Sequence, residues 1–236
     1  MEVMKLYYYA ILFFSFISAT MLAQDETPAP FINESKSFKK QYYVFSPRVS
    51  ITVPHPIANR SFKKSFVGIY EISGGFNIML YKGLFAGITY KNGLFKVMEN
   101  KIPDYNAKMY INNGAIKVGS DFYVGDKNRI ILSTALSAGK NQTHFASLIC
   151  KDPANHPVMI TAYETTFIEP EINLFFLIEP NFGIGATLSY TTFNRLFDPY
   201  ELCLDDWAQF DRNSKGATQH FSFGFGFYYS FLKKKP

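Results

Sequence analysis

The chain has 236 residues, 18% of them aromatic, and a formal net charge of +5 at pH 7. Three of the positive charges lie in the C-terminal tail and no basic groove pattern accompanies the rest, which argues against a nucleic acid as partner. Mean hydropathy is −0.04, so the aromatic residues are matched by polar ones, as happens when side chains alternate along strands.

The N-terminal 23 residues have the pattern of an export signal. Lys5 provides a short basic start, and the apolar run Leu6–Ile17 precedes small residues that suit cleavage after Ala23, with Ala19 as an alternative. After the signal, no segment has the roughly eighteen uninterrupted apolar residues of a spanning helix. We therefore expect an exported chain that begins with a disordered periplasmic leader at residues 24–41.

Residues 42–232 alternate between apolar and polar side chains in segments that predict eight strands. Their approximate ranges are 43–53, 66–80, 84–97, 106–124, 129–145, 158–178, 182–191 and 219–231. The last segment is the clearest, with Phe223, Phe225 and Phe227 on one face and Gly224 and Gly226 on the other. A soluble sheet would bury this aromatic face, whereas a transmembrane barrel shows it to lipid and turns the small residues inward.

The connections alternate in length. Long polar loops follow the first, third, fifth and seventh segments, and short turns such as residues 125–128 join the others. Outer-membrane barrels combine short periplasmic turns with longer external loops. The sequence therefore predicts an all-β fold, an eight-stranded antiparallel up-and-down transmembrane β-barrel over residues 42–232, followed by a basic tail at 233–236.

Over Tyr43–Phe231 the chain resembles the small eight-stranded outer-membrane barrels of the OmpA and OmpX type. Its residue pattern is similar to that of the outer-membrane β-barrel proteins of the Bacteroidetes. The similarity is clearest in Glu-Pro-Glu-Ile-Asn-Leu from Glu169 and Pro-Asn-Phe-Gly-Ile-Gly from Pro180. The resemblance implies an outer-membrane location, with outer-membrane lipid and the barrel-assembly machinery as partners. Such chains often end on an aromatic residue that this machinery reads, whereas here Leu232 and a lysine tail follow Phe231.

Seven charged residues fall on the faces predicted to line the barrel interior. They are Arg48, Glu71, Lys91, Lys117, Asp121, Glu169 and Glu171. Charges in a low-dielectric interior are costly unless they are paired, so this nearly balanced set predicts a network that fills the lumen. Eight strands also leave no room for an open diffusion pore. The alternative is that these groups form an ion path or an acid/base pair.

The sequence offers little for catalysis. The histidines, His55, His144, His156 and His220, fall in predicted loops or at the outer ends of strands. The nearest hydrolase-like grouping is His220 beside Ser222 with an acid such as Asp211, but no nucleophile elbow accompanies it. We expect no catalytic residue, no cofactor and no metal site, and we expect the acidic residues of loop four (194–218) to be solvated.

The two cysteines, Cys150 and Cys203, fall in loop three (147–157) and loop four, which are neighbours in an up-and-down barrel. We expect them to form a disulfide, with two free thiols as the alternative. Loop four also carries an apolar cluster, which either folds over the barrel mouth or is offered to a protein partner. Its members are Tyr200, Leu202, Leu204, Trp207 and Phe210.

These observations predict a non-enzymatic outer-membrane barrel with a structural or interaction role, acting through loops three and four. Two alternatives remain at this point. One is a lipid A-modifying enzyme on the same scaffold, and the other is a soluble, lipocalin-like ligand binder, which would turn apolar side chains inward.

Overall fold

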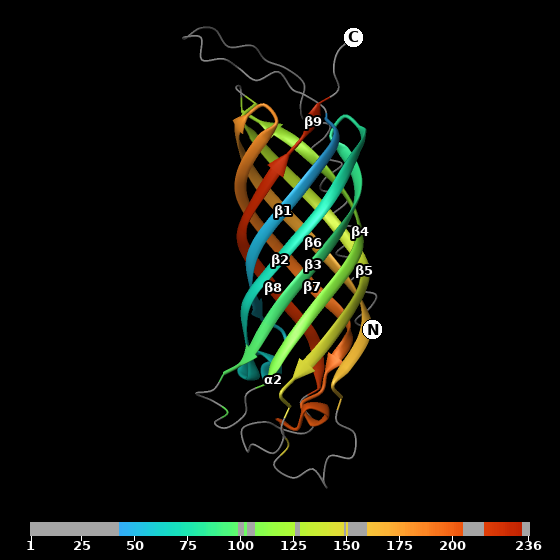
Figure 1. The fold of residues 1–236 in the computed structure, drawn as a ribbon, viewed down its shortest axis with the longest axis vertical. Helices are drawn as coiled ribbons and strands as arrows, with labels where there is room; N and C mark the ends of the chain where they lie inside the picture. The colour runs from blue at the N-terminus through green and yellow to red at the C-terminus, as the bar shows by residue number, and fades with distance from the viewer. Residues whose placement is uncertain are drawn as a thin grey trace. The chain divides into compact units, whose positions relative to one another are not determined.

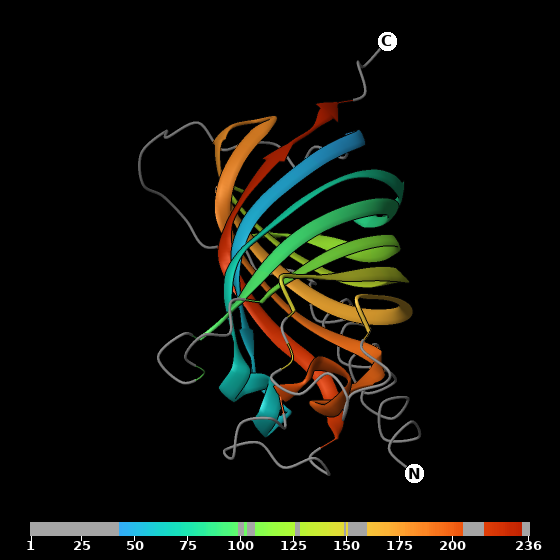
Figure 2. The ribbon, with the colours of Figure 1, turned by 60° about the horizontal axis from the view of Figure 1, so that its bottom comes forward.

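In a computed structural model of the protein, the described residues are 43–98, 102, 107–125, 128–148, 150, 160–204 and 215–232. They form one antiparallel sheet that closes into a barrel (Figures 1 and 2). Neighbouring strands follow chain order, and β1 closes the sheet because it pairs with both β2 and β8. The predicted signal, leader and basic tail lie outside the described residues.

The strands are mostly 14 to 18 residues long. They are β1 Tyr43–Pro56, β2 Phe66–Tyr81, β3 Leu84–Val97, β4 Lys108–Val124, β5 Ile130–Ala146, β6 Ala162–Glu179, β7 Phe182–Phe197, β8 Gly216–Tyr229 and β9 Phe231–Leu232. The two-residue β9 continues the line of β8 along β1, so eight strands build the wall. The predicted eight-stranded, antiparallel up-and-down fold is confirmed.

The two ends of the barrel differ. We call one the turn end, because the β2–β3 and β6–β7 connections there are each two residues long. At the first of these turns Gly83 has a φ of +101°, and a Cβ there would lie 2.6 Å from the carbonyl oxygen of Asp121. The opposite loop end carries the helix α2 (Arg60–Ser65) and the 3-10 helix η2 (Tyr200–Leu202). Among the described residues, no helix has the length and apolar composition needed to cross a membrane.

The predicted alternation holds along most of the wall, with two local corrections. A register shift between Gly68 and Tyr70 reverses the faces of β2, so Gly68 is buried rather than outward. Pro170 has no backbone N–H and would therefore be expected at a bulge, but it lies in continuous register with Leu136 of β5. The strands beside loop four are also longer than expected, since β7 continues to Phe197 and β8 begins at Gly216.

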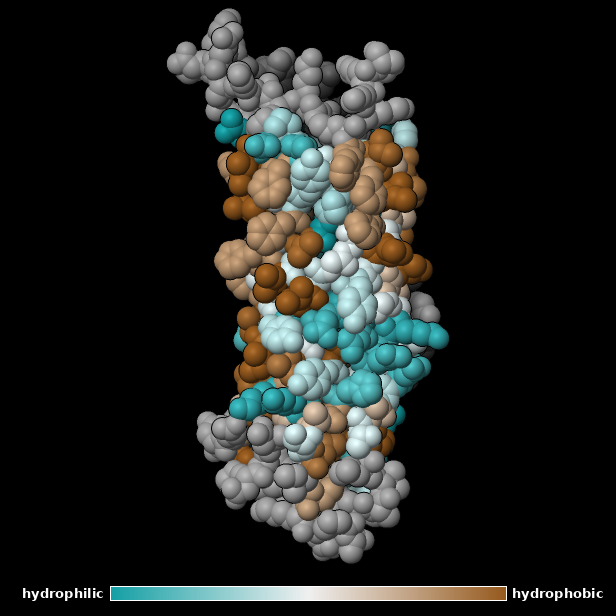
Figure 3. Space-filling view, in the orientation of Figure 1, coloured by the Kyte–Doolittle hydropathy of each residue, from teal (hydrophilic) through white to brown (hydrophobic). Residues whose placement is uncertain are grey.

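Large apolar side chains cover the outer wall toward the turn end. On β6, Ile168, Ile172, Leu174, Phe176 and Ile178 all point outward and are 38–53% exposed. This stretch of β6, residues 168–178, has about the length of a tilted strand that crosses a bilayer. Figure 3 shows the apolar band in brown and a hydrophilic area, in teal, over the lower part of the wall on the right.

Candidate functional site in the barrel interior

The largest ionic cluster of the interior is centred on Lys91. Its Nζ lies 3.0 Å from Oε1 of Glu71 and donates to both carboxylate oxygens of Glu169 at 2.8 Å. Each of the two carboxylates also accepts a hydrogen bond from a hydroxyl group. Thr191 donates to Glu169 at 2.6 Å, and Thr52 donates to Glu71 at 3.1 Å. One lysine from β3 therefore links carboxylates on β2 and β6 through the interior.

His220 belongs to this cluster, which corrects its expected place at the outer end of a strand. Its Nε2 lies 3.1 Å from Oε2 of Glu71, and the residue is fully buried. The imidazole also meets the rings of Phe95 and Phe193, with centroid distances of 5.4 and 5.7 Å. The sequence contained the signal, because His220 shares the parity of Ser222 and Gly224 and so belongs to the inward face of β8.

Two further ion pairs lie toward the turn end. Lys117 donates to both oxygens of Glu171 at 3.0 Å, and Asn173 donates to the same carboxylate at 2.7 Å. Arg48 pairs with Asp121 at 2.5 Å. The Arg48 guanidinium donates to Ser133 at 2.7 Å and to Tyr43 at 3.1 Å, and it lies 4.8 Å from the ring centroid of Phe85 and 5.2 Å from that of Tyr228.

The structure thus places all seven predicted lumen charges inside the wall, and each contacts an opposite charge. The three ion-pair groups connect strands that are not neighbours in the sheet, such as β3 with β6 and β1 with β4. A buried ion pair adds little stability compared with apolar packing. Removing one partner, however, leaves the other charge buried without a counter-charge, which lowers the free energy of unfolding strongly. The pairs are satisfied only when these strands face each other across the interior, so the network favours this arrangement of the wall over others.

A small polar cavity lies between the Arg48 group and the Lys117–Glu171 pair. Its volume is about 20 Å³, and Asn77, Asn173 and Thr187 are among the residues that line it. This is room for one or two water molecules. In this section the side chains fill the barrel, as eight strands predict.

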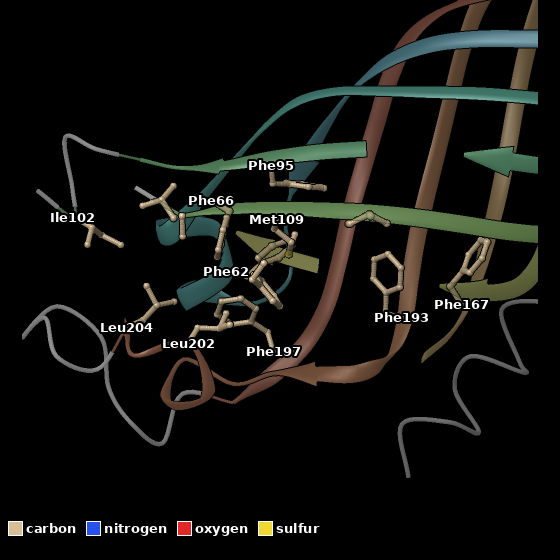
Figure 4. Packing of buried hydrophobic residues seen from close by; sticks show 14 residues of the cluster. Phe62, Phe66, Phe95, Ile102, Met109, Phe167, Phe193, Phe197, Leu202 and Leu204 are labelled. Atoms are coloured by element: carbon tan, nitrogen blue, oxygen red, sulfur yellow. The ribbon is translucent and has the colours of Figure 1, made fainter. Parts of the chain in front are cut away.

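The loop end of the interior is apolar. Fourteen buried residues form a cluster there that we call the apolar cap (Figure 4). They are Phe62, Phe66, Phe95, Val97, Ile102, Ala107, Met109, Ile111, Phe145, Phe167, Phe193, Phe197, Leu202 and Leu204. The sequence showed which of these residues share a face of a strand. It did not show that the apolar face turns inward at this end, because an apolar interior was expected only of a soluble barrel.

Phe62 comes from a segment predicted to be a polar loop. Asn59 caps α2 by accepting hydrogen bonds from the backbone N–H groups of Ser61 and Phe62, at 2.7 and 3.2 Å. The helix turns Phe62 into the barrel mouth, where it is 0% exposed and packs on Phe66, Phe95 and Phe197 with centroid distances of 5.1–5.9 Å. A single short helix thus supplies the centre of the apolar cap.

The described part of loop four, up to Leu204, also folds over the mouth. Cys150 and Cys203 form a disulfide, with a Cα–Cα distance of 5.3 Å. Leu202 and Leu204, on either side of Cys203, are 4% and 0% exposed, so they belong to the apolar cap and do not offer an apolar surface to a partner. Tyr200 is half-buried, while Trp207 and Phe210 lie outside the described residues.

Charged residues fix the base of loop four. Arg195 pairs with Glu201 at 2.7 Å and lies 4.5 Å from the ring centroid of Tyr163. Asp198 pairs with the exposed Lys215 at 2.5 Å. The hydrogen bond to Asp198 and the charge of its carboxylate raise the pKa of Lys215 above its usual value. Asp198 and Glu201 are therefore engaged with cations of the same loop.

Among the residues that the structure describes, the remaining candidates for chemistry do not form a site on the outer surface. His55 and His144 are exposed on the outer wall, and His156 lies outside the described residues. His220 and Ser222 both point into the filled interior, and Asp211 lies outside the described part of the chain. The described residues thus do not bring the histidine, serine and acid of the predicted grouping together on a surface open to a substrate.

No protein-family model and no curated protein matches the chain. Among solved structures, it is similar to the neisserial surface protein NspA, with a TM-score of 0.49 and 10% identity over 79% of this chain and 97% of that one. It is similar to OprG of Pseudomonas aeruginosa, with a TM-score of 0.49 and 12% identity over 82% and 98%. It is also similar to the outer-membrane protease OmpT of Escherichia coli, with a TM-score of 0.38 and 9% identity over 80% and 94%.

These neighbours are outer-membrane barrels, and at such identities the similarity concerns the fold alone. They do not bear on the resemblance to the Bacteroidetes proteins, which stays a prediction. The described residues form a closed eight-stranded barrel whose interior holds three ion-pair groups beneath an apolar cap.

Proposed function

We propose that the chain is a non-enzymatic outer-membrane β-barrel that anchors an interaction surface at its loop end. The observation that carries this proposal is the polarity of the wall, which is apolar outside and charged inside, the reverse of a soluble protein. Outward residues such as Ile172 and Phe225 are 39% and 71% exposed, while Lys91 and Glu169 are 5% and 1% exposed. A wall of this kind is stable when lipid surrounds it, because lipid takes the place of the apolar core.

Aromatic side chains support a membrane position. Outward tyrosines lie near both borders of the apolar band, with Tyr90 toward the loop end and Tyr81 and Tyr229 toward the turn end. Tyrosine prefers the interface of a bilayer, where its ring is in contact with apolar chains and its hydroxyl with water. The turn end would then face the periplasm and the loop end the exterior.

The filled interior supports a role in contact rather than in transport. The ionic groups occupy the middle of the lumen and the apolar cap closes the loop end, which leaves a cavity of only about 20 Å³ between Arg48 and Lys117. A soluble, lipocalin-like binder would carry apolar side chains along its whole interior. Here the ionic middle section argues against that alternative, and loops three and four remain the surface proposed for a protein partner.

The first test is electrophoretic mobility. The full-length protein is purified from membranes in mild detergent and compared unheated and boiled, and its fractionation with outer membrane is followed. We expect a heat-dependent shift and outer-membrane fractionation. Soluble expression without a shift would overturn the membrane proposal and favour the soluble binder.

The non-enzymatic part needs its own experiment. The mass profile of lipid A is compared between cells with and without the protein, and planar-bilayer conductance is recorded with the purified barrel. We expect an unchanged lipid A profile and no steady conductance. A reproducible mass change in lipid A would replace the proposal with the lipid-modifying enzyme, and a steady current would contradict a filled lumen.

A further inference from the structure

The barrel wall is not paired along its whole height between β6 and β7. Toward the loop end their ladder stops at the pair Phe167–Phe193, although both strands continue beyond it. Among the described strands, residues 162–166 of β6 pair in register with β5 alone. We call the gap between this part of β6 and residues 194–197 of β7 the seam. At the seam β6 has an open edge.

The register with β5 shows which backbone groups of β6 face the seam. The N–H of Phe145 donates to the carbonyl oxygen of Thr161 at 2.8 Å, so Thr161 and every second residue after it bond to β5. In an antiparallel ladder the backbone groups alternate from one side of a strand to the other. The residues in between, Ala162, Glu164 and Thr166, therefore turn their N–H and C=O groups toward the seam.

Pro170 supports this alternation. It belongs to the same series of positions as Glu164 and Thr166, it keeps its register with β5, and the ladder with β7 is interrupted between Ile168 and Glu171. A proline disturbs only the ladder that its missing N–H would have joined. β6 thus already carries one proline on the side that faces β7 without losing its pairing with β5.

Side chains bridge the inner side of the seam. Arg195 of β7 lies 4.5 Å from the ring centroid of Tyr163 of β6 and pairs with Glu201 at 2.7 Å. At the far end of the seam, the N–H of Ile160 donates to the carbonyl oxygen of Glu201 at 3.2 Å. A cavity of about 10 Å³ lies among these residues. The open edge therefore has room for about six residues of an extended chain, or roughly 20 Å.

The described residues on the outer side of the seam give it a negative charge. Glu164 is exposed, and its Oε1 accepts a hydrogen bond from Gln142 of β5 at 2.9 Å. The outward residues on the β7 side, Asn194 and Leu196, carry no charge, and Lys140 lies on β5, away from the seam. A strand added at the seam would place an outward side chain beside Glu164, and opposite charges stabilise such a pair.

We propose that the seam binds an extended segment of a partner protein, which adds to the edge of β6 as a further strand. The inference rests on the proposed function, because the seam lies where loops three and four join the barrel. Backbone pairing supplies the affinity, since an open strand edge is a template for another strand. The segment has a basic side chain facing out, beside Glu164, and small side chains facing in, where the cavity is only about 10 Å³.

Hydrogen exchange of single backbone amides, measured by NMR on the full-length protein in detergent micelles, tests the open edge. We expect the N–H groups of Ala162, Glu164 and Thr166 to exchange fast. Those of Tyr163 and Thr165 belong to the ladder with β5 and should exchange at least about tenfold more slowly. Equal protection of the two sets would overturn the inference, because it would show that the edge is already paired.

The probe for binding is the peptide Ala-Thr-Ala-Lys-Ala-Thr-Ala, blocked at both ends, in which the lysine faces out when the alanines face in. We expect saturable binding that slows exchange of the three seam amides. Glutamate in place of the lysine should weaken binding about two- to fivefold, because it would lie beside Glu164. Methylation of the lysine's backbone nitrogen should weaken it by about tenfold, because that N–H bonds to β6. Unchanged exchange at millimolar peptide would overturn the inference.

Two variants of one residue separate backbone pairing from side-chain contact. Thr166→Pro removes a single N–H on the side of the seam and, like Pro170, leaves the register with β5. We expect it to weaken peptide binding roughly three- to tenfold. Thr166→Ala keeps the N–H and is the matched control, so its affinity should stay within about twofold of the natural sequence. Equal losses in the two variants would contradict strand addition.

The heat-dependent gel shift is measured on every sample before exchange or titration. Its absence in the natural sequence means that the proposed membrane barrel has failed. Its presence in all samples, together with seam amides that are protected without peptide or unaffected by it, means that only the assignment of the seam has failed.

Discussion

On the β3–β6 side of the wall, the middle of the barrel and its loop end use the same alternation of side chains with opposite polarity. In the middle section, Lys91 and Glu169 point inward and Ile172 points outward. At the loop end, Phe95 points inward and Gln142 points outward on the β3–β6 side of the wall. A period of two fixes which residues share a face, and the medium outside the wall decides which face is apolar.

His220 marks the border between the two sections. It meets Glu71 on one side and the rings of Phe95 and Phe193 on the other. The middle section is held by charge pairs whose removal leaves a buried charge, whereas the loop end is held by packing whose removal leaves a cavity. Substitutions in the two sections should therefore fail in different ways.

The largest effect is expected from Lys91→Met. The substitution removes the cation between Glu71 and Glu169, so we expect the free energy of unfolding to fall by about 3–5 kcal/mol. It is measured by urea unfolding of the protein folded in lipid vesicles, with the gel shift as readout. As a control, Lys117→Met combined with Glu171→Met removes a whole pair and should cost less than about 1 kcal/mol. Equal losses in both proteins would show that unmatched charge does not govern this section.

Phe62→Ala tests the apolar cap. Phe62 is 0% exposed, and its truncation should lower the free energy of unfolding by about 3 kcal/mol, because a cavity remains among the neighbouring rings. We also expect faster proteolysis at the loop end while the heat-dependent gel shift persists. Lys63→Ala, on the exposed side of the same helix, is the matched control and should leave both measurements unchanged. A loss of the gel shift with Phe62→Ala would mean that the two sections fold as one unit.

Ile172→Lys tests the medium outside the wall. In lipid vesicles a lysine in the apolar band should lower the free energy of unfolding by about 2–3 kcal/mol. The loss should be smaller for a lysine near the edge of the lipid layer. Thr166→Lys lies on the same strand and the same face, six residues toward the loop end, and should change stability by less than about 0.5 kcal/mol. Similar losses of unfolding free energy for the two substitutions would place both positions in the same medium. This result would contradict an edge of the lipid layer between Thr166 and Ile172.

The smallest effect is expected from the double substitution Cys150→Ser and Cys203→Ser. A native disulfide typically contributes about 2–4 kcal/mol, and we expect the lower figure because Leu202 and Leu204 remain in the apolar cap. The measurement is the rate of proteolysis of loops three and four in the double variant and in the natural sequence, the latter with and without reductant. Urea unfolding of both proteins gives the free energy of unfolding. A disulfide that made no difference to loop-end proteolysis would show that packing alone holds loop four.

The sequence by itself determined the strand count, the antiparallel order and the inward position of all seven charged residues from Arg48 to Glu171. These follow from the period-two pattern and the alternation of short and long connections, which are local features. It also contained enough to place His220 inside, since that residue shares its parity with Ser222.

Only the tertiary structure decided which charges meet and what closes the barrel. The pairs Lys91–Glu169 and Arg48–Asp121 join residues more than seventy positions apart, and their choice depends on the stagger of the strands around the closed wall. Phe62 reads as part of a polar loop, because an isolated apolar residue carries no periodic signal, and the sequence left open whether Leu204 folds over the barrel mouth or meets a partner. They become core residues only when the barrel mouth gives them a surface on which to pack.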